Sequence, residues 1–160
     1  MANCYDQVWW YERGSFRLLF ANGRVADVGS FGCCGKGGGV VILVTGAIAS
    51  GKRTFVASIG FSPADMADAT LGAPVVFNVQ DMLVRQEGVA VPEELIDELC
   101  RCKVVIVDEV GCGVHPLERA ERDWREAVGR LTCKLSEHSE AQVRMVCGIP
   151  TVLKGDPWNC

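Results

Sequence analysis

The amino-acid sequence predicts an α/β protein of three layers, in which helices cover both faces of a mostly parallel sheet. Short runs that are almost wholly apolar alternate with segments in which apolar residues recur every three or four positions. This is the pattern of buried parallel strands joined by amphipathic helices. The first apolar run also leads directly into a glycine loop closed by lysine, VVILVTGAIASGKRT. A strand, a glycine turn and a helix in this order are typical of a phosphate-binding site.

The composition is that of a globular protein with room for one domain of ordinary size. Hydrophobic residues make up 49% of the 160 positions and charged residues 22%, which argues against a disordered chain. The net charge of −4 and the pI near 5.2 disfavour broad binding to nucleic acid or to anionic membranes. No apolar run is long enough to span a bilayer and no signal pattern opens the chain, so we expect a cytoplasmic protein.

Residues 1–39 differ in character from the rest of the chain. An aromatic stretch is followed by an alternating segment in which Asn22 and Gly23 separate two apolar runs, which is a hairpin signal. The glycine-rich sequence GSFGCCGKGGG then indicates a flexible linker. We therefore expect 1–39 to be an N-terminal extension with a possible hairpin, and 40–160 to be the nucleotide-binding, kinase-like domain.

The first half of the expected domain contains two strands and one helix. An apolar strand over Val40–Thr45 precedes the glycine loop, and a helix follows over Lys52–Ile59. Residues 61–72 form a loop or a short helix over 64–69, because a Ser-Pro pair precedes that stretch. A second apolar strand follows at Ala73–Phe77.

The second half of the domain continues the alternation of helices and strands. Residues 79–83 have helical spacing, and Pro92 opens a helix with acidic residues in its first turn. A third strand covers Lys103–Val107, and a fourth, Val143–Cys147, stops at a Gly-Ile-Pro sequence. Between them, 116–137 is an amphipathic helix. Its apolar residues share one face: Leu117, Ala120, Trp124, Val128, Leu131 and Leu135.

Neither the cysteines nor the histidines have the spacing of a metal site. The nine cysteines include no C-x-x-C pair, the spacing that zinc ligands usually show, so we interpret them as free thiols. The two histidines, His115 and His138, lie in polar or loop segments. We interpret both as structural or solvated residues.

The glycine loop supplies the candidate nucleotide site. Gly46 to Lys52 fits the pattern G-x-x-x-x-G-K, whose backbone N–H groups surround phosphates while the lysine reaches the outer ones. Arg53 departs from the pattern, because a Ser or Thr hydroxyl there normally completes a Mg²⁺ shell and arginine only donates hydrogen bonds. Arg53 could contact phosphate itself, or the site could have lost its metal and its turnover. The expected nucleotide-binding residues are Gly46, Ala47, Ile48, Ala49, Ser50, Gly51, Lys52, Arg53 and Thr54.

Two carboxylates, Asp108 and Glu109, follow the third strand directly. Ligands of open α/β sheets bind at this carboxyl edge, where the glycine loop also lies. We expect Asp108 to hold Mg²⁺ and Glu109 to orient an attacking hydroxyl. Together with Lys52 they form the predicted catalytic set.

Two blocks of the sequence resemble the adenosylcobinamide kinase/adenosylcobinamide-phosphate guanylyltransferase family of cobalamin biosynthesis. The first block is VILVTGAIASGKR, and the second runs from VVIVDEVGCGVHP to GIPTVLKG. The resemblance implies a RecA-like P-loop sheet that assembles into small oligomers. It also implies phosphoryl transfer from ATP or GTP to the aminopropanol hydroxyl of adenosylcobinamide, followed in full-length members by GMP transfer through a guanylylated histidine.

By position, the resemblance covers both motifs but not that histidine. The matching positions are Gly46, Ser50, Gly51, Lys52, Glu109, Val110, Gly111, Gly113 and Pro116. Residues 61–72, where the family places the histidine, contain none, and Asn78 stands where longer members carry an acidic residue. The sequence therefore resembles a short, kinase-like member that lacks the residue for guanylyl transfer.

The leading hypothesis is a nucleotide-dependent adenosylcobinamide kinase that uses ATP or GTP with Mg²⁺ and acts as a homo-oligomer. The alternative is a non-catalytic nucleotide-binding or corrinoid-sensing protein, which Arg53 and the missing histidine favour. A DNA-linked ATPase is disfavoured by the net charge.

Overall fold

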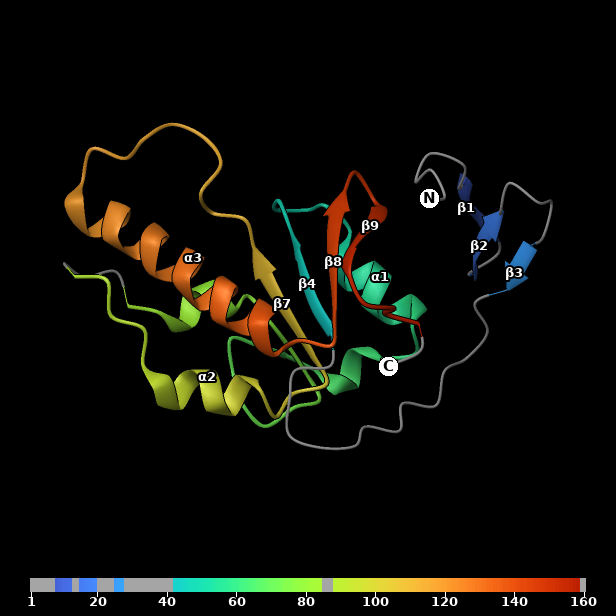
Figure 1. Cartoon of the computed structure of the whole chain (residues 1–160), viewed down its shortest axis with the longest axis horizontal. Coiled ribbons are helices and arrows are strands. Elements are labelled where there is room, and N and C mark those ends of the chain that lie inside the picture. Colours follow the sequence, from blue (N-terminus) through green and yellow to red (C-terminus); the bar gives the residue numbers. More distant parts are fainter. Residues whose placement is uncertain (1–7, 13–14, 20–24, 28–41, 85–87, 159–160) are drawn as a thin grey trace.

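The computed structural model describes residues 8–12, 15–19, 25–27, 42–84 and 88–158. These residues form two separate sheets, one of three strands near the N-terminus and one of six strands in the remainder (Figure 1). Each sheet has its own strand pairing, and the larger one carries the candidate site. The predicted linker lies outside the described residues.

The larger sheet is mostly parallel, as the sequence predicts. Its strands lie in the order β5-β6-β7-β4-β8-β9. Only β9 is antiparallel to its neighbour. The strands are β4 (Ile42–Gly46), β5 (Met66–Asp68), β6 (Val75–Phe77), β7 (Val104–Asp108), β8 (Ala141–Val146) and β9 (Ile149–Lys154).

Helices cover both faces of this sheet, which confirms the predicted layering (Figure 1). They are α1 (Lys52–Ser58), α2 (Glu93–Leu99) and α3 (Arg119–His138), with single 3₁₀ turns at η1 (Pro63–Asp65) and η2 (Val79–Met82). Alternate residues of a strand point to opposite faces. Ile42 and Val44 accordingly pack with α1, whereas Leu43 between them packs with α2 and α3.

Two strands of the larger sheet are absent from the predicted element list. The helix expected over 64–69 is instead the short turn η1 followed by β5, because Ser62 and Asp65 close a capping box that encloses only one turn. The predicted stop after β8 is a tight turn. Cys147 and Gly148 both have positive φ angles of 50° and 82°, which suit a two-residue hairpin turn, and β9 returns along β8.

The smaller sheet is an antiparallel meander of β1 (Val8–Glu12), β2 (Ser15–Leu19) and β3 (Val25–Asp27). Leu19 pairs with Val25, so β2 and β3 flank the predicted Asn-Gly turn, which itself lies outside the described residues. The aromatic stretch supplies a third strand that the sequence analysis did not assign.

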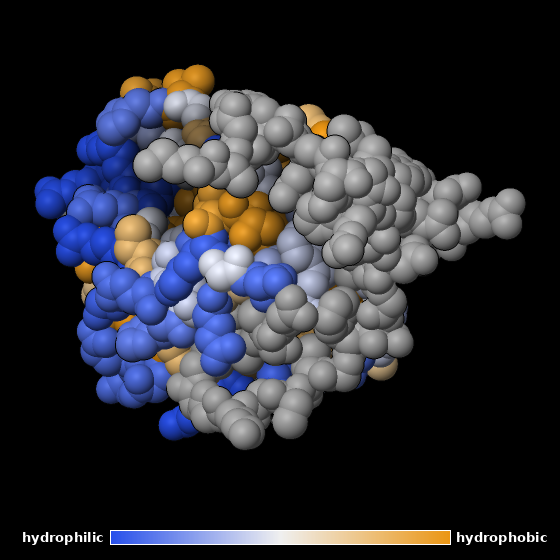
Figure 2. Space-filling model, turned by 45° about the vertical axis from the view of Figure 1, so that its right-hand side comes forward, coloured by the Kyte–Doolittle hydropathy of each residue, from blue (hydrophilic) through white to orange (hydrophobic). Residues whose placement is uncertain are grey.

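In the part of the chain that the structure describes, the state of the cysteines and the hydropathy of the surface are those expected of a globular protein. The described cysteines are thiols and not disulfide partners, as predicted: Cys100, Cys102, Cys112, Cys133 and Cys147. Burial, with a smaller effect of the nearby Glu98 carboxylate, raises the pKa of Cys102 above its usual value. In Figure 2 the coloured residues are mostly hydrophilic, and hydrophobic ones gather in a central hollow. No helix among the described residues is long and apolar enough to cross a bilayer.

Candidate functional site

The glycine loop joins β4 to α1 and is shaped by close contacts with the β8–β9 hairpin. A Cβ atom on Gly46 would lie 2.6 Å from the Met145 carbonyl oxygen, so only glycine fits there. Gly51 has a φ of 91°, and the Gly148 N–H donates to the Ser50 carbonyl oxygen at 3.0 Å. The loop is therefore fixed from the hairpin side and open on the side of α1 and β6.

Lys52 is the buried cation at the centre of the loop. Its side chain is only 8% exposed, and its Nζ lies 2.7 Å from Asp108 Oδ1. The same ammonium donates to the carbonyl oxygens of Gly46 and Ala47 at 2.9 and 2.6 Å, and lies 3.4 Å from Ser50 Oγ. A buried charge needs such compensation. Lys52 thus ties the loop to the end of β7.

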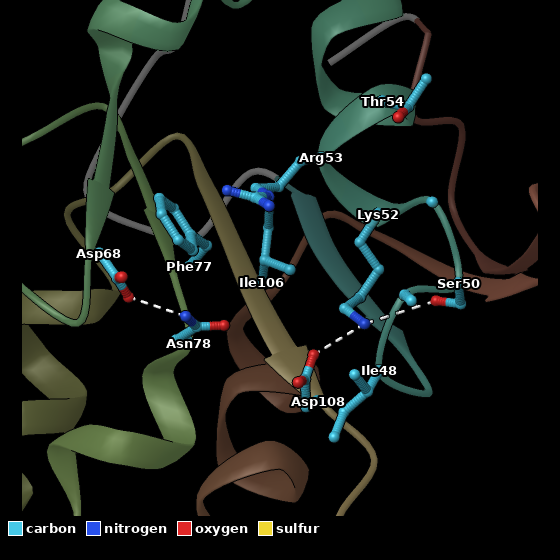
Figure 3. A pocket seen from close by; sticks show the side chains of 12 residues that line it. Ile48, Ser50, Lys52, Arg53, Thr54, Asp68, Phe77, Asn78, Ile106 and Asp108 are labelled. Atoms are coloured by element: carbon cyan, nitrogen blue, oxygen red, sulfur yellow. Dashed lines mark hydrogen bonds and ion pairs between the residues drawn. The ribbon is translucent and has the colours of Figure 1, made fainter.

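Asp108 reaches this position because β7 lies next to β4, with Asp108 level with Gly46. Its backbone N–H donates to Gln80 Oε1 at 3.1 Å, which holds the end of the strand to η2. The Asp108 side chain is 14% exposed. Lys52 and Asp108, which the sequence predicts as separate members of the catalytic set, are therefore joined by an ion pair at the carboxyl edge of the sheet (Figure 3).

A cavity of about 470 Å³, the loop cavity, lies against these residues. Its lining includes every predicted loop position from Ile48 to Thr54, whereas Gly46 and Ala47 are not part of the lining. It also includes residues at the ends of three neighbouring strands. These residues are Asp68, Phe77, Asn78, Ile106 and Asp108.

Arg53 points across the loop cavity toward β6 (Figure 3). Its guanidinium carbon lies 5.0 Å from the centroid of the Phe77 ring, within the range of a cation–π contact. Thr54, the only hydroxyl residue next to it, lies away from the pair of Lys52 and Asp108 (Figure 3). The loop therefore places a guanidinium, and no hydroxyl, where the usual pattern has a metal-binding Ser or Thr.

Asp108 offers Mg²⁺ a carboxylate ligand at this site. Asp108 faces the loop cavity, and Mg²⁺ commonly takes one or two carboxylates together with substrate phosphates and water. Within the described ranges, no group of three or more metal-binding side chains gathers. The site thus fits a metal held chiefly by phosphates and Asp108, and does not fit an all-protein cage.

Glu109 lines a second cavity and is not part of the loop cavity. Both its carboxylate oxygens accept hydrogen bonds from Arg144 of β8, at 2.7 and 2.8 Å. These bonds and the charge of Glu109 raise the pKa of the Arg144 guanidinium. The two side chains line a cavity of about 380 Å³ between the sheet and α3, the Glu109 cavity. Asp108 borders both cavities.

The loop after β7 forms one wall of the Glu109 cavity and is fastened to α3. Arg125 donates to the carbonyl oxygen of Val114 at 3.1 Å, and Arg122 donates to those of Pro116 and Leu117 at 3.0 and 2.5 Å. His115 is exposed in this loop, outside the loop cavity. The arrangement holds an apolar wall in place next to Glu109.

Sequence reasoning missed several residues at these cavities. Asp68 was missed because β5 was not predicted; its carboxylate accepts a hydrogen bond from Asn78 Nδ2 at 2.8 Å. Phe77 and Asn78 end an apolar strand, the same signal that identified Asp108. Arg144 is an exposed position between two buried ones in β8, so strand alternation alone could have placed it on the α3 face.

Residues 75–153 match the model of the family described as cobinamide kinase / cobinamide phosphate guanyltransferase. This match supports the assignment of the chain to that family. The matched residues of this chain run from β6 into β9 and include Asp108, Glu109 and Arg144. The glycine loop precedes them. The family assignment predicted from the two motifs is confirmed. A comparison with curated proteins returned no match.

Proposed function

We propose that this chain is a nucleotide-dependent kinase that phosphorylates the aminopropanol hydroxyl of adenosylcobinamide. Membership of the family sets the class, processing of cobinamide in cobalamin biosynthesis. The observation that carries the kinase step is the position of Asp108. Asp108 borders both the loop cavity and the Glu109 cavity. A phosphoryl donor in the loop cavity and an acceptor in the Glu109 cavity would therefore meet beside Asp108.

The loop cavity would hold the phosphates of ATP or GTP. The backbone N–H groups of Ala47–Gly51 and the Lys52 ammonium are the donors that such loops use. Lys52 would exchange its contacts with the Gly46 and Ala47 carbonyl oxygens, 2.9 and 2.6 Å long, for contacts with phosphate oxygens. A RecA-like P-loop arrangement is the finer fold assignment that this proposal assumes.

Mg²⁺ would be held by Asp108, by the phosphates and by water, and would supply neutralisation of the phosphate charge. The protein's own contribution is position. Lys52 keeps Asp108 at the edge of the loop cavity through the 2.7 Å ion pair. Phosphoryl transfer needs little more than alignment and charge neutralisation from the protein.

The Glu109 cavity would receive the aminopropanol arm of the corrinoid. Its lining combines apolar side chains, among them Val107, Val110 and Val128, with the Glu109 carboxylate. Glu109 would accept a hydrogen bond from the attacking hydroxyl, and Arg144 would hold the carboxylate in one orientation. Guanylyl transfer is not part of the proposal, because 61–72 lack a histidine.

We also propose that the protein is a cytoplasmic homo-oligomer that binds neither nucleic acid nor membrane. Exposed apolar side chains on the β8–β9 hairpin support self-association, since patches of this kind mark interaction surfaces. They are Val146, Ile149, Val152 and Leu153.

The deciding experiment is incubation of the purified protein with adenosylcobinamide, Mg²⁺ and ATP or GTP labelled in the terminal phosphate. We expect label in adenosylcobinamide phosphate. Lys52→Ala should abolish the transfer, because it removes the loop cation. Lys134→Ala is the matched control, since this lysine lies in α3 outside both cavities and pairs with Glu93 among the described residues. Nucleotide binding without transfer under either nucleotide would contradict the kinase.

A non-catalytic nucleotide-binding or corrinoid-sensing protein is the second candidate function. Arg53 favours it, because the guanidinium stands where catalytic loops have a metal-binding hydroxyl. The test compares the wild type with Arg53→Ser in the same transfer assay. Mg²⁺-dependent transfer that appears only in the variant would establish this alternative, and transfer by the wild type would reject it.

A further inference from the structure

Arg53 is the least engaged cation at the loop cavity. Lys52 is enclosed by two loop carbonyl oxygens and by Asp108. Arg53, in contrast, has an exposed side chain, and its contact within the described part of the chain is the Phe77 ring 5.0 Å away. No hydrogen bond or ion pair joins its guanidinium to another described residue. Its five N–H donors are therefore available to a ligand in this cavity.

Phe77 gives the guanidinium a fixed place from which to act. The ring comes from the end of β6 and stands on the far side of the cavity from the glycine loop (Figure 3). Stacking on an aromatic face restricts a flat guanidinium while leaving its edge donors accessible. Arg53 therefore lies across the opening between α1 and β6, with its side chain accessible from solvent.

The charges around the loop cavity show what this arginine changes. Among the described lining residues, Lys52 and Arg53 are cations and Asp68 and Asp108 are anions, so the formal charges cancel. Without Arg53 the lining would carry one excess negative charge. A polyphosphate would then enter against that charge unless a divalent cation came with it.

We propose that Arg53 binds the phosphates of the nucleotide directly and so makes nucleotide affinity independent of Mg²⁺. In the usual loop a hydroxyl reaches the phosphates through the metal. A guanidinium reaches phosphate oxygens itself, through paired N–H donors. Mg²⁺ at Asp108 then serves transfer and is not required for binding. This inference rests on the proposed nucleotide site and adds how the site recognises its ligand.

The test measures the Kd of non-hydrolysable ATP and GTP analogues by titration calorimetry, once with Mg²⁺ and once with EDTA. For the wild type we expect the two Kd values to agree within about threefold, a difference well below one tenfold step of affinity. For Arg53→Ser in EDTA we expect a Kd about tenfold or more higher, the size of a lost charge-assisted hydrogen bond. Mg²⁺ should restore part of that loss.

Matched variants separate charge, stacking and folding. Arg53→Lys keeps the charge without the paired donors and should fall between wild type and Arg53→Ser. Phe77→Leu should weaken binding less than Arg53→Ser does, because the guanidinium remains. Arg101→Ser removes a 66% exposed arginine that pairs with Glu98 outside both cavities, and should leave both Kd values unchanged. Circular dichroism checks that each variant is folded.

The outcomes separate this inference from the proposed function. A wild type that binds neither analogue, with or without Mg²⁺, overturns both. A wild type that binds only with Mg²⁺ overturns the role of Arg53 and leaves the kinase standing. Equal Kd values for wild type and Arg53→Ser in EDTA also overturn the role of Arg53 and leave the kinase proposal standing. The predicted order of the variants supports the inference.

Discussion

Gly46 is required by its neighbours as well as by its motif. The Met145 carbonyl oxygen and Ser50 Oγ would lie 2.6 and 2.7 Å from an added Cβ atom. Gly46→Ala should therefore displace the loop, lower the free energy of unfolding by about 1–3 kcal/mol and weaken nucleotide binding. Thermal unfolding and calorimetry measure the two effects. An alanine variant with unchanged Tm and Kd would show that the loop has more room than the structure gives it.

Gly129 of α3, in contrast to Gly46, has room for a side chain. It is exposed within a long helix, and an added Cβ would meet nothing within 4 Å. Gly129→Ala should raise the free energy of unfolding by about 0.5–1 kcal/mol, because glycine is a poor helix former. Denaturant unfolding provides the measurement.

Asp108 and Glu109 are neighbours in sequence, but only Asp108 borders both cavities. Glu109 lines the cavity beside α3 and does not line the loop cavity. If the kinase proposal holds, Glu109→Ala should lower kcat/KM for adenosylcobinamide and leave the nucleotide Kd unchanged, whereas Asp108→Ala should change both. Steady-state kinetics and calorimetry distinguish them. Loss of nucleotide affinity in Glu109→Ala would mean that the two cavities act as one.

The motif predicts which residues form the glycine loop and the start of α1, and seven of them line the loop cavity: Ile48, Ala49, Ser50, Gly51, Lys52, Arg53 and Thr54. The sequence predicts the surroundings of the two carboxylates less well. Glu109 lines the Glu109 cavity and not the loop cavity, whereas Asp108 borders both, and the order of the two residues along the chain does not predict this difference. Arg144 could not be assigned as the partner of Glu109, because that pairing depends on β8 lying beside β4, a contact across about 100 residues of chain.

Among the elements, the 3₁₀ turn η2 supports the site through two hydrogen bonds of Gln80. Gln80 is buried, accepts a hydrogen bond from the Asp108 N–H through its side chain, and accepts one from Trp124 Nε1 through its backbone carbonyl at 3.2 Å. This single turn therefore links α3 to the carboxyl end of β7. The sequence indicated helical spacing there, but not that one side chain would join two elements.

Gln80→Leu tests this link. It leaves the Asp108 N–H without its acceptor, so the free energy of unfolding should fall by about 1–3 kcal/mol, and nucleotide affinity should fall with it because Asp108 loses its anchor. Gln142→Leu is the control, since Gln142 lies at the amino end of β8 and contacts Ser136. Unfolding by urea and calorimetry decide. Reduced stability with unchanged affinity would show that Gln80 serves the fold alone.

The elements that the sequence missed are the two edge strands of the larger sheet. Three residues of β5 are too few for a recognisable alternation. β9 contains a proline at its second position, which argues against a central strand but is tolerated at an edge. Edge strands are short and partly exposed, so their sequences carry less of the hydrophobic signal that identified β4, β6, β7 and β8.

At the scale of the whole molecule, the predicted division at residue 40 remains to be tested. Among the residues whose side chains the structure describes, which begin at 42, those that form the core clusters cover both faces of the larger sheet. We therefore expect a chain of residues 40–160 to fold and to bind nucleotide with the Kd of the full chain. Circular dichroism and calorimetry of the shortened protein measure this. An insoluble or non-binding product would assign the N-terminal residues to the domain itself.

The hydrogen bond from the Gly148 N–H to the Ser50 carbonyl oxygen determines which fragments of this chain would keep the shape of the glycine loop. The phosphate motif is complete by Lys52, yet its shape depends on a turn nearly 100 residues later. A fragment ending before that turn would still contain every residue of the motif, but it would lose the backbone hydrogen bond that holds the loop in place. Whether a fragment of this protein keeps the loop in this shape therefore depends on Gly148 as well as on the loop residues themselves.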